Sequence, residues 1–291
     1  VLDDRGASIL IADAQRRVIA RASLEADTAH GRAFARVLEA ASDQGIEAAL
    51  AAIVSSRDAV REFIVGAGDL ASGLRDLRRA LSLGSGETAE SLRDRLGSEI
   101  PFDDAELRQL VDRLAASGAN DKKSAERLAP ILTAETAEGR ATAWLGFWMK
   151  QDGDLRVVGS LTTKGIRTAW PGLEETLSDE RDRIELLLDR IASAEAYAVT
   201  SALLTLGDAV IGDYERAKQL RGALDFQDLV VKTANLLARS DAAAWVHYKL
   251  DRGVDHVLVD EAQDTSPRQW QVIERLAGEF FTGQSARDVI R

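Results

Sequence analysis

The chain has 291 residues, of which 45% are hydrophobic, so one large domain or two smaller domains with a sizeable core are possible. Cysteine is absent and only three histidines occur, which excludes a disulfide framework or a thiolate metal site and argues against a transition-metal site. The net charge of −11 is opposite to the basic footprint of most nucleic-acid-binding proteins and, taken alone, indicates a soluble acidic protein. No apolar run near membrane-spanning length and no signal peptide are evident, so we expect a cytoplasmic protein without a membrane partner.

Residues 1–149 are predicted to form helices joined by short polar turns. Ala, Leu, Arg, Glu and Asp are abundant and only four prolines occur, which is typical of a mainly helical chain. The stretch DDRGASILIADAQRRVIARA has acids at its start and apolar residues at helical spacing. Gly45 is a candidate helix stop and Ser56 a candidate helix cap. We expect a helical bundle without a catalytic motif in this half.

The composition changes near Lys150, where Gly, Thr, Val and Pro in GDLRVVGSLTTKGIRTAWPG predict a short β excursion or an ordered loop. Residues 140–170 contain five basic residues and two acidic residues, which is a local excess of positive charge in an acidic chain. Phosphate contacts by Lys and Arg position nucleic acid without reading its sequence. Lys150, Lys164 and Arg167 are therefore candidate DNA contacts, and the alternative is a solvated face with ordinary ion pairs.

Residues 173–222 form a long stretch with mostly helical apolar spacing, and LDFQDLVVKTANLLA predicts a further helix. Next comes HVLVDEAQDTSPRQW, in which Val257–Val259 fits a strand buried on both faces, as in a parallel sheet. A last helix is predicted to begin near Ser266, which would cap it, with Pro267 in its first turn.

The acids after Val257–Val259 are the candidate catalytic residues. Side chains at the carboxyl end of a parallel strand emerge where α/β proteins bind ligands. Asp260 would hold Mg²⁺ and the nucleotide there, and Glu261 would take part in the metal site and deprotonate the attacking water. Gln263 would contact the γ-phosphate or that water. The apolar-apolar-Asp-Glu pattern alone is common, and its alternative interpretation is a strand end with solvated acids.

The longer string VDEAQDTSPRQW resembles the second motif of superfamily 1 helicases of the UvrD/Rep type, and most of all that of the AddA helicase–nuclease subunit of bacterial double-strand-break repair. YERAKQLRGALDFQDLVVKTANLL resembles the segment that precedes this motif in the same helicases. The start of the chain resembles the piece that follows the Thr-x-His motif of AddA proteins. Asp225 and Asp228 of LDFQDL are expected to cap and decorate a helix start and not to act chemically.

The resemblance also explains a missing element. A phosphate-binding loop needs glycines followed by Lys and Ser or Thr, and the chain contains no Gly-Lys pair. In these helicases the motor domain 1A starts with that loop, leaves to build the helical domain 1B and returns at the acidic motif. We therefore expect an internal fragment of mainly α fold. Residues 1–220 would form the inserted domain 1B, and residues 221–291 would be the end of 1A, a partial α/β P-loop domain with one or few strands.

The resemblance implies an ATP-dependent 3′-to-5′ DNA helicase and exonuclease subunit of recombinational double-strand-break repair. Its cofactors would be ATP and Mg²⁺ in the parent protein, with none bound by this chain and no ATPase activity of its own. Its partners would be duplex or forked DNA and an AddB-type nuclease subunit. The alternatives are a non-catalytic helical module that binds DNA or protein, and another helicase of the UvrD or RecB type.

Overall fold

The structure is a computed structural model that describes residues 1–41, 43–238, 245–246 and 257–282. Every regular element in these residues is helical, and an isolated antiparallel bridge joins Met149 to Leu155. The expectation of a mainly α chain is therefore confirmed. The α-helices are α1 (Asp4–Leu24), α2 (Ala29–Ala40), α3 (Asp43–Ser55), α4 (Arg57–Ala67), α5 (Leu70–Ala80), α6 (Ala89–Ser98), α7 (Asp104–Ala115), α8 (Ala119–Leu128), α9 (Ala137–Trp148), α10 (Val158–Leu161), α11 (Lys164–Ala169), α12 (Leu173–Leu220), α13 (Phe226–Leu237) and α15 (Pro267–Thr282). Two short 3₁₀ helices are η1 (Ala129–Thr133) and η2 (Ala262–Asp264).

The chain divides into two compact units, which are described separately. The central unit comprises residues 25–49 and 56–206, and the terminal unit comprises residues 1–24, 50–55 and those from Gly207 onward. Helix α12 contributes its first part to the central unit and its end to the terminal unit. The predicted division at residue 220 into domains 1B and 1A stays a prediction.

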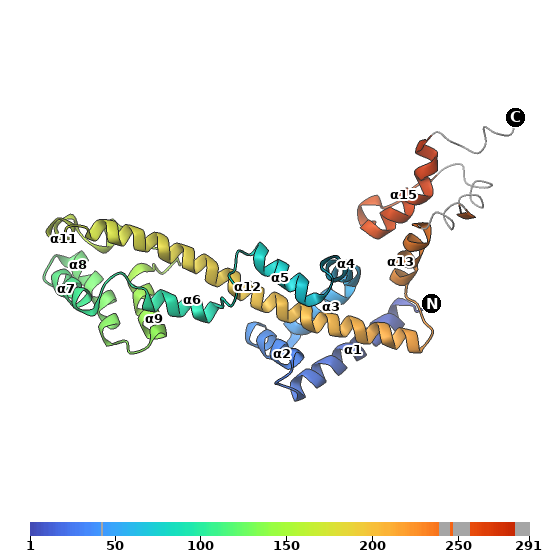
Figure 1. Cartoon of the computed structure of the whole chain (residues 1–291), viewed down its shortest axis with the longest axis horizontal. Helices are drawn as coiled ribbons and strands as arrows, with labels where there is room; N and C mark the ends of the chain where they lie inside the picture. Colours follow the sequence, from blue (N-terminus) through green and yellow to red (C-terminus); the bar gives the residue numbers. More distant parts are fainter. Residues whose placement is uncertain (42, 239–244, 247–256, 283–291) are drawn as a thin grey trace. The chain divides into compact units, whose positions relative to one another are not determined.

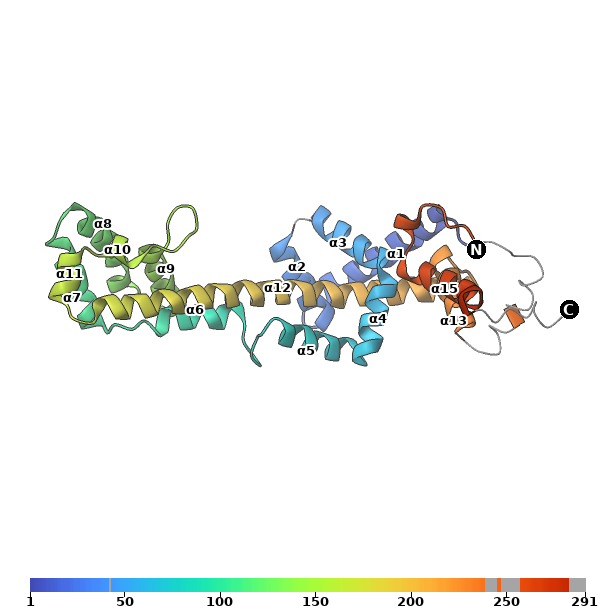
Figure 2. The same ribbon diagram turned by 90° about the horizontal axis from the view of Figure 1, so that it is seen from above.

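The core of the central unit is built by α6 to α9 against the first part of α12, and the two views in Figures 1 and 2 agree on this arrangement. Helices α6 and α9 approach closely at Gly97, where an added Cβ would lie 2.0 Å from the carbonyl oxygen of Ala137. Three buried aromatic rings of α9 pack edge-on or stacked: Trp144, Phe147 and Trp148. The aromatic core of this unit thus comes largely from one helix.

Trp144 also anchors a buried ion pair. Its indole Nε1 donates a hydrogen bond of 2.6 Å to Glu180 of α12, which is 2% exposed. Arg183 donates from its guanidinium to both oxygens of the same carboxylate, at 2.6 and 2.7 Å. A buried charge is tolerated only when it is paired and hydrogen-bonded, and Glu180 meets both conditions.

The terminal unit joins the two ends of the described chain. Helix α1 buries a stripe with a spacing of four residues, Leu10, Ala14, Val18 and Ala22. Arg17 and Arg21 of α1 both pair with Asp213 of α12, at 3.2 and 3.3 Å. The backbone N–H of Leu2 donates a hydrogen bond of 2.7 Å to the carbonyl oxygen of Leu224. These contacts hold α1 against the end of α12 and the turn before α13.

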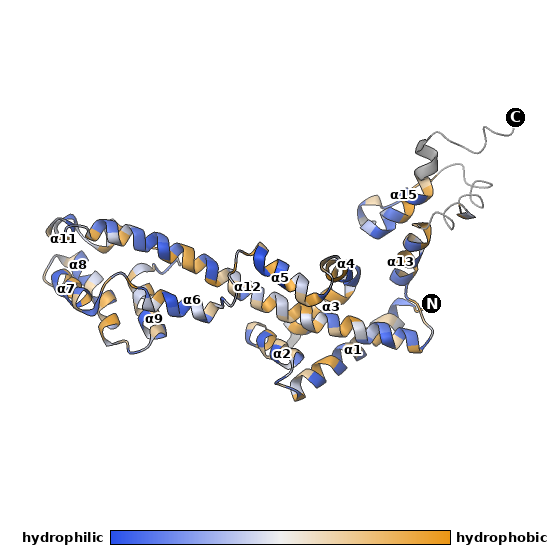
Figure 3. Ribbon diagram, viewed as in Figure 1, coloured by the Kyte–Doolittle hydropathy of each residue, from blue (hydrophilic) through white to orange (hydrophobic). Residues whose placement is uncertain are grey.

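Helix α12 contains a long apolar stretch. Residues 196–212 have one charged side chain, Asp208, and Figure 3 shows the corresponding change from blue to pale and orange along the helix. By length and composition alone, α12 could cross a membrane. The core helix of a water-soluble domain passes the same test, and Leu206, Val210 and Ile211 are fully buried within the protein.

Three sequence expectations need correction. Val257–Val259 forms no strand, and its side chains are 37–93% exposed, because no strand in the described residues offers a ladder of hydrogen bonds. The partial α/β domain is therefore not confirmed. Gly45 does not stop a helix but lies in the first turn of α3, whereas α2 ends at Ala40. Ser56 precedes α4 as expected, but its hydroxyl makes no capping hydrogen bond.

Candidate acidic turn and its pocket

The predicted catalytic residues lie on one exposed turn between Val259 and α15. Asp260, Glu261 and Gln263 are all exposed. The backbone N–H of Glu261 donates to Asp260 Oδ1 at 3.0 Å, and Gln263 Nε2 donates to Glu261 Oε2. The turn therefore brings the three predicted side chains together through contacts within the motif itself.

Glu261 has an unusual backbone conformation. Its φ of 49° and ψ of 45° lie in the left-handed region, where a residue with a Cβ is strained by roughly 1–3 kcal/mol. The only other such non-glycine residue in the described chain is Ser82. Backbone strain of this kind concentrates at functional sites, where it fixes the direction of a side chain.

The turn is fixed at its far end by the start of α15. Ser266 Oγ accepts a hydrogen bond of 3.3 Å from the N–H of Gln269, whose side-chain Oε1 accepts one of 2.7 Å from the N–H of Ser266. This reciprocal capping box, with Pro267 as the first helical residue, confirms the predicted helix start. Only residues 262–266 separate the acids Asp260 and Glu261 from the start of α15, and the capping box fixes the end of this short connection.

The turn borders a pocket of about 560 Å³. Asp260, Glu261 and Thr265 supply oxygen atoms at one side of it. The remaining lining comes from one face of α13 and one face of α15: Phe226, Leu229, Val230, Thr233, Gln269, Val272 and Ile273. A mostly apolar cavity with a few convergent polar groups is the usual form of a small-molecule site.

The oxygen donors of the turn fit a magnesium ion. Mg²⁺ prefers oxygen ligands, keeps several waters and needs only one or two protein carboxylates. Asp260 and Glu261 offer two exposed carboxylates beside the Thr265 hydroxyl, which lies on the same pocket. Over the described part of the chain, no group of three or more His, Asp or Glu side chains gathers in a way that could hold a metal ion. Asp260, Glu261 and Thr265 therefore suit a Mg²⁺ ion that is also bound by a ligand better than a metal ion held by protein side chains alone.

A buried cluster positions the helix that forms the pocket wall. Lys218 of α12 is 3% exposed and donates from Nζ to Asp225 at 3.0 Å and to Asp228 at 2.5 Å. The Tyr214 hydroxyl donates to Asp225 at 2.6 Å, and its ring lies 4.6 Å from the Lys218 ammonium. Asp225 also caps α13 and forms a capping box with Asp228.

The structural role expected for Asp225 and Asp228 is therefore the observed one. Sequence reasoning did not assign Lys218 and Tyr214 to the same cluster. The sequence did contain a signal: LDFQDL begins four residues after the last residue of α12, and a capping carboxylate there leaves a charge to be paired.

The predicted DNA contacts are differently placed. Lys150 is partly exposed, and its Nζ lies 3.6 Å from Oδ2 of Asp154. Lys164 is exposed at the start of α11. The Arg167 side chain is 16% exposed, pairs with Glu174 at 3.2 Å and donates to the Thr162 carbonyl oxygen. Lys150 and Lys164 are accessible to solvent, whereas Arg167 is engaged by the fold.

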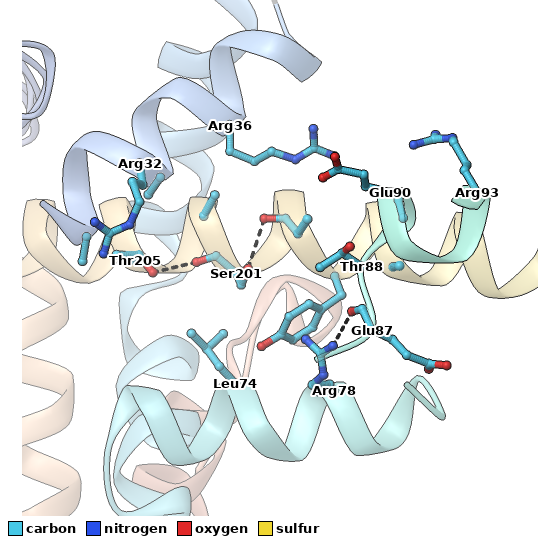
Figure 4. A pocket seen from close by; sticks show the side chains of 17 residues that line it. Arg32, Arg36, Leu74, Arg78, Glu87, Thr88, Glu90, Arg93, Ser201 and Thr205 are labelled. Carbon is cyan, nitrogen blue, oxygen red and sulfur yellow. Dashed lines mark hydrogen bonds between the residues drawn. The ribbon is translucent and has the colours of Figure 1, made fainter. Parts of the chain in front are cut away.

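The central unit contains a pocket of similar volume, about 560 Å³, lined by arginines of three helices (Figure 4). Arg78 lies over the ring of Tyr197 at 5.0 Å and donates to the carbonyl oxygen of Gly84 at 2.9 Å. Arg36 pairs with Glu39 at 2.9 Å. These guanidinium groups already have partners within the protein.

Comparison with known proteins gives partial matches. Residues 173–282 match the family model described as the UvrD/REP helicase N-terminal domain. The chain is 41% identical over 76 residues to the RecBCD enzyme subunit RecB of Mycolicibacterium smegmatis, covering 26% of this chain and 6% of that protein. It is 36% identical over 94 residues to the ATP-dependent DNA helicase UvrD1 of Mycobacterium leprae, covering 32% of this chain and 12% of that protein.

A wider but weaker match is an ATP-dependent helicase/nuclease subunit of Latilactobacillus sakei, 26% identical over 166 residues, covering 51% of this chain and 18% of that protein. No solved structure matches. The chain thus spans between 6% and 18% of the length of these curated relatives.

Proposed function

From its relationship to UvrD-like superfamily 1 helicases, we propose that this chain supplies the acidic motif of an ATP-driven DNA translocase. The observation that carries the proposal is the turn at Asp260 to Gln263. It presents two carboxylates and an amide beside a pocket, and it lies within the residues that match the helicase family model. Strain at Glu261 supports a functional purpose for this turn.

The three side chains have different roles in the proposed reaction. Asp260 binds the metal–nucleotide complex, in which a bound Mg²⁺ would neutralise phosphate charge. Glu261 orients the attacking water and accepts its proton. Gln263, hydrogen-bonded to Glu261, holds that carboxylate in position, and its amide would contact the γ-phosphate or the attacking water. Thr265 adds a hydroxyl at the edge of the same pocket.

Within this class, we favour a helicase–nuclease subunit of the AddA type, acting 3′ to 5′ in recombinational repair of double-strand breaks. The similarity to the helicase/nuclease subunit of Latilactobacillus sakei extends over half of the chain, further than the similarity to RecB or UvrD1. The proposal includes a cytoplasmic location, DNA as substrate and a partner nuclease of the AddB type. It also includes Lys150 and Lys164 as contacts to DNA phosphates, with Arg167 supporting them from within the fold.

The phosphate-binding loop of the proposed enzyme would come from outside these 291 residues, since they contain no Gly-Lys pair. The chain by itself should therefore show no measurable ATP hydrolysis, with or without DNA. A coupled phosphate-release assay on the purified chain tests this. DNA-stimulated turnover by these residues alone would contradict the assignment of the acidic turn as half of a site.

The decisive experiment substitutes Glu261→Gln in the longer protein that also carries a phosphate-binding loop. We expect ATP hydrolysis and DNA unwinding to fall by at least about 100-fold, while ATP affinity is retained, because the base is lost but the metal ligand Asp260 is kept. Glu274→Gln on the exposed face of α15 is the matched control and should leave turnover unchanged.

Equal turnover of the two variants would reject Glu261 as the base and would favour the alternative of a non-catalytic interaction module. Loss of ATP binding with Glu261→Gln would also count against the assigned role. For the DNA contacts, reversing the charge of Lys150 and Lys164 should weaken DNA binding and reduce its salt dependence. Unchanged affinity would indicate an ordinary solvated face.

A further inference from the structure

A second polar pocket lies in the central unit, between α8 and the segment that runs through α10 to Thr163. Its volume is about 290 Å³, which is suited to a small ion and too small for a nucleotide. Three basic side chains line it, Lys123, Arg127 and Arg156. They stand out in a chain with a net charge of −11.

Neither arginine of this pocket forms an ion pair with an acidic side chain within the described residues. Arg127 donates from one terminal nitrogen to Ser124 Oγ at 2.8 Å. Its Nε and the Nε of Arg156 are both buried, and neither has a hydrogen-bond partner within the described residues. A buried guanidinium N–H without an acceptor is costly. Four other described arginines also have such an Nε atom, so the feature that distinguishes this site is that Arg127 and Arg156 line one pocket together.

The electrostatics agree with the geometry. Burial and the neighbouring charge of Arg156 both lower the pKa of Arg127, and Glu126 opposes them only as a smaller effect. The like charges of Arg127 and Arg156 therefore repel each other in the free protein. An anion placed between them would convert this repulsion into two attractive contacts.

Asp121 borders the same pocket but does not neutralise the arginines. Its Oδ1 accepts from the N–H of Thr163 at 2.9 Å. Its Oδ2 accepts from the hydroxyls of Thr163 and Ser117, at 2.7 and 2.5 Å. The carboxylate thus ties α8 to the segment before α11, and the pocket keeps an excess of positive charge.

The larger arginine-lined pocket of Figure 4 lacks these features. There, Arg36 and Arg93 pair with Glu39 and Glu195, and Arg78 donates to two backbone carbonyl oxygens. Its cations are satisfied within the protein. The smaller pocket is therefore the better candidate for an anion.

We propose that Arg127 and Arg156, with Lys123 at the rim, form a binding site for a tetrahedral oxyanion of the phosphate class. The two guanidinium groups offer forked N–H donors that match phosphate oxygens in pairs, and the lysine adds a mobile charge. The oxyanion is either free inorganic phosphate or one phosphodiester of a nucleic-acid strand. This site is separate from the acidic turn and does not depend on the proposed function.

The test measures thermal unfolding of the full chain in sodium chloride and in sodium phosphate at equal ionic strength. Phosphate should raise the unfolding midpoint of the unsubstituted chain by about 5 °C near saturation, because the anion binds only the folded state. Arg156→Gln and Arg127→Gln should each abolish this rise. Arg108→Gln, an exposed arginine of α7, is the control and should retain it.

The chloride measurement separates binding from a structural role. Without phosphate, Arg156→Gln should leave the midpoint unchanged or raise it, because a like-charge contact is removed. Titration calorimetry with inorganic phosphate checks the affinity directly, and competition with a single-stranded oligonucleotide identifies the source. Displacement of phosphate by the oligonucleotide assigns the site to a phosphodiester, and phosphate binding without displacement assigns it to free phosphate. Equal responses of the unsubstituted chain and Arg156→Gln to phosphate would overturn the proposal, as would a lower midpoint of Arg156→Gln in chloride.

Discussion

Replacing Lys218 by methionine should destabilise the protein strongly, because the change removes the ammonium group that pairs with the buried Asp225 carboxylate. The side chains of Lys218 and Asp225 are 4% and 7% exposed, and their Nζ–Oδ2 distance is 3.0 Å. Methionine retains the length and the apolar stem of lysine, so the main loss is the ammonium group. Removing one partner of a buried ion pair typically costs about 3–5 kcal/mol.

The hydrogen bond from Tyr214 to Asp225 persists in this variant and limits the loss, whereas Asp228, which is 23% exposed, can be solvated. We therefore expect the free energy of unfolding to fall by roughly 3 kcal/mol, near the lower end of that range. The measurement is urea denaturation followed by circular dichroism at the helical minimum. Hydrogen exchange of the α13 amides should report the same loss locally, since Asp225 caps that helix.

Two further variants make the reasoning testable. Lys232→Met changes an exposed lysine of α13 and should cost no more than about 0.5 kcal/mol. Adding Asp225→Asn to Lys218→Met removes the stranded charge and keeps a side-chain oxygen for the cap, so the double variant should be more stable than Lys218→Met alone. A cost below about 1 kcal/mol for Lys218→Met, or an equal cost for Lys232→Met, would refute the argument.

Four other substitutions probe the central unit. Gly97→Ala should lower the free energy of unfolding, measured by urea denaturation, by about 1–3 kcal/mol or more, because the added Cβ would lie 2.0 Å from the backbone oxygen of Ala137. Gly66→Ala in α4 should raise it by roughly 0.5–1 kcal/mol, because no described atom lies within 4 Å of the added Cβ. Trp144→Phe should cost about 1–3 kcal/mol by the same assay, since the buried Glu180 carboxylate loses its indole donor; a cost within error would exclude that hydrogen bond as a contributor. Burial raises the pKa of Asp121, but hydrogen bonds from neighbouring hydroxyl and N–H groups outweigh it and leave the pKa below its usual value. Its stabilisation is therefore present above about pH 4 and lost on further acidification. The difference in unfolding midpoint between the unsubstituted chain and Asp121→Asn should accordingly shrink between pH 6 and pH 3, and a constant difference would contradict the lowered pKa.

Local patterns predicted the helical elements well, and their ends in part. The apolar spacing of α1 and the Ser-Pro start of α15 depend on neighbours within a few residues, and the sequence displays those neighbours directly. Gly45 failed as a stop signal because glycine in a first helical turn is tolerated when the helix continues through an apolar stretch. Asp260 and Glu261 were assigned from a local pattern of the same kind, and their catalytic role stays a prediction.

Long-range features were not accessible from the pattern. The apolar run Val257–Val259 predicts a strand only if partner strands lie beside it, and the described residues contain none. Arg156 lies beside Arg127 because the loop after α9 folds back onto α8. No periodicity in the sequence encodes this fold of the loop. Lys164 and Arg167 are close in sequence, yet one is exposed and the other is held by Thr162 and Glu174.

The hydrogen bond between Leu2 and Leu224 has a consequence for the order of events during synthesis. Helix α1 is made first, but the part of α12 that carries Asp213 follows about 190 residues later, roughly 10–40 s at bacterial rates of translation. The central unit is complete in the growing chain before that point. During the delay, residues 50–55 are the only other part of this unit that has already been made, so α1 lacks the contacts that α12 supplies. Because its contacts join residues so far apart in the sequence, the terminal unit is completed later than the central unit.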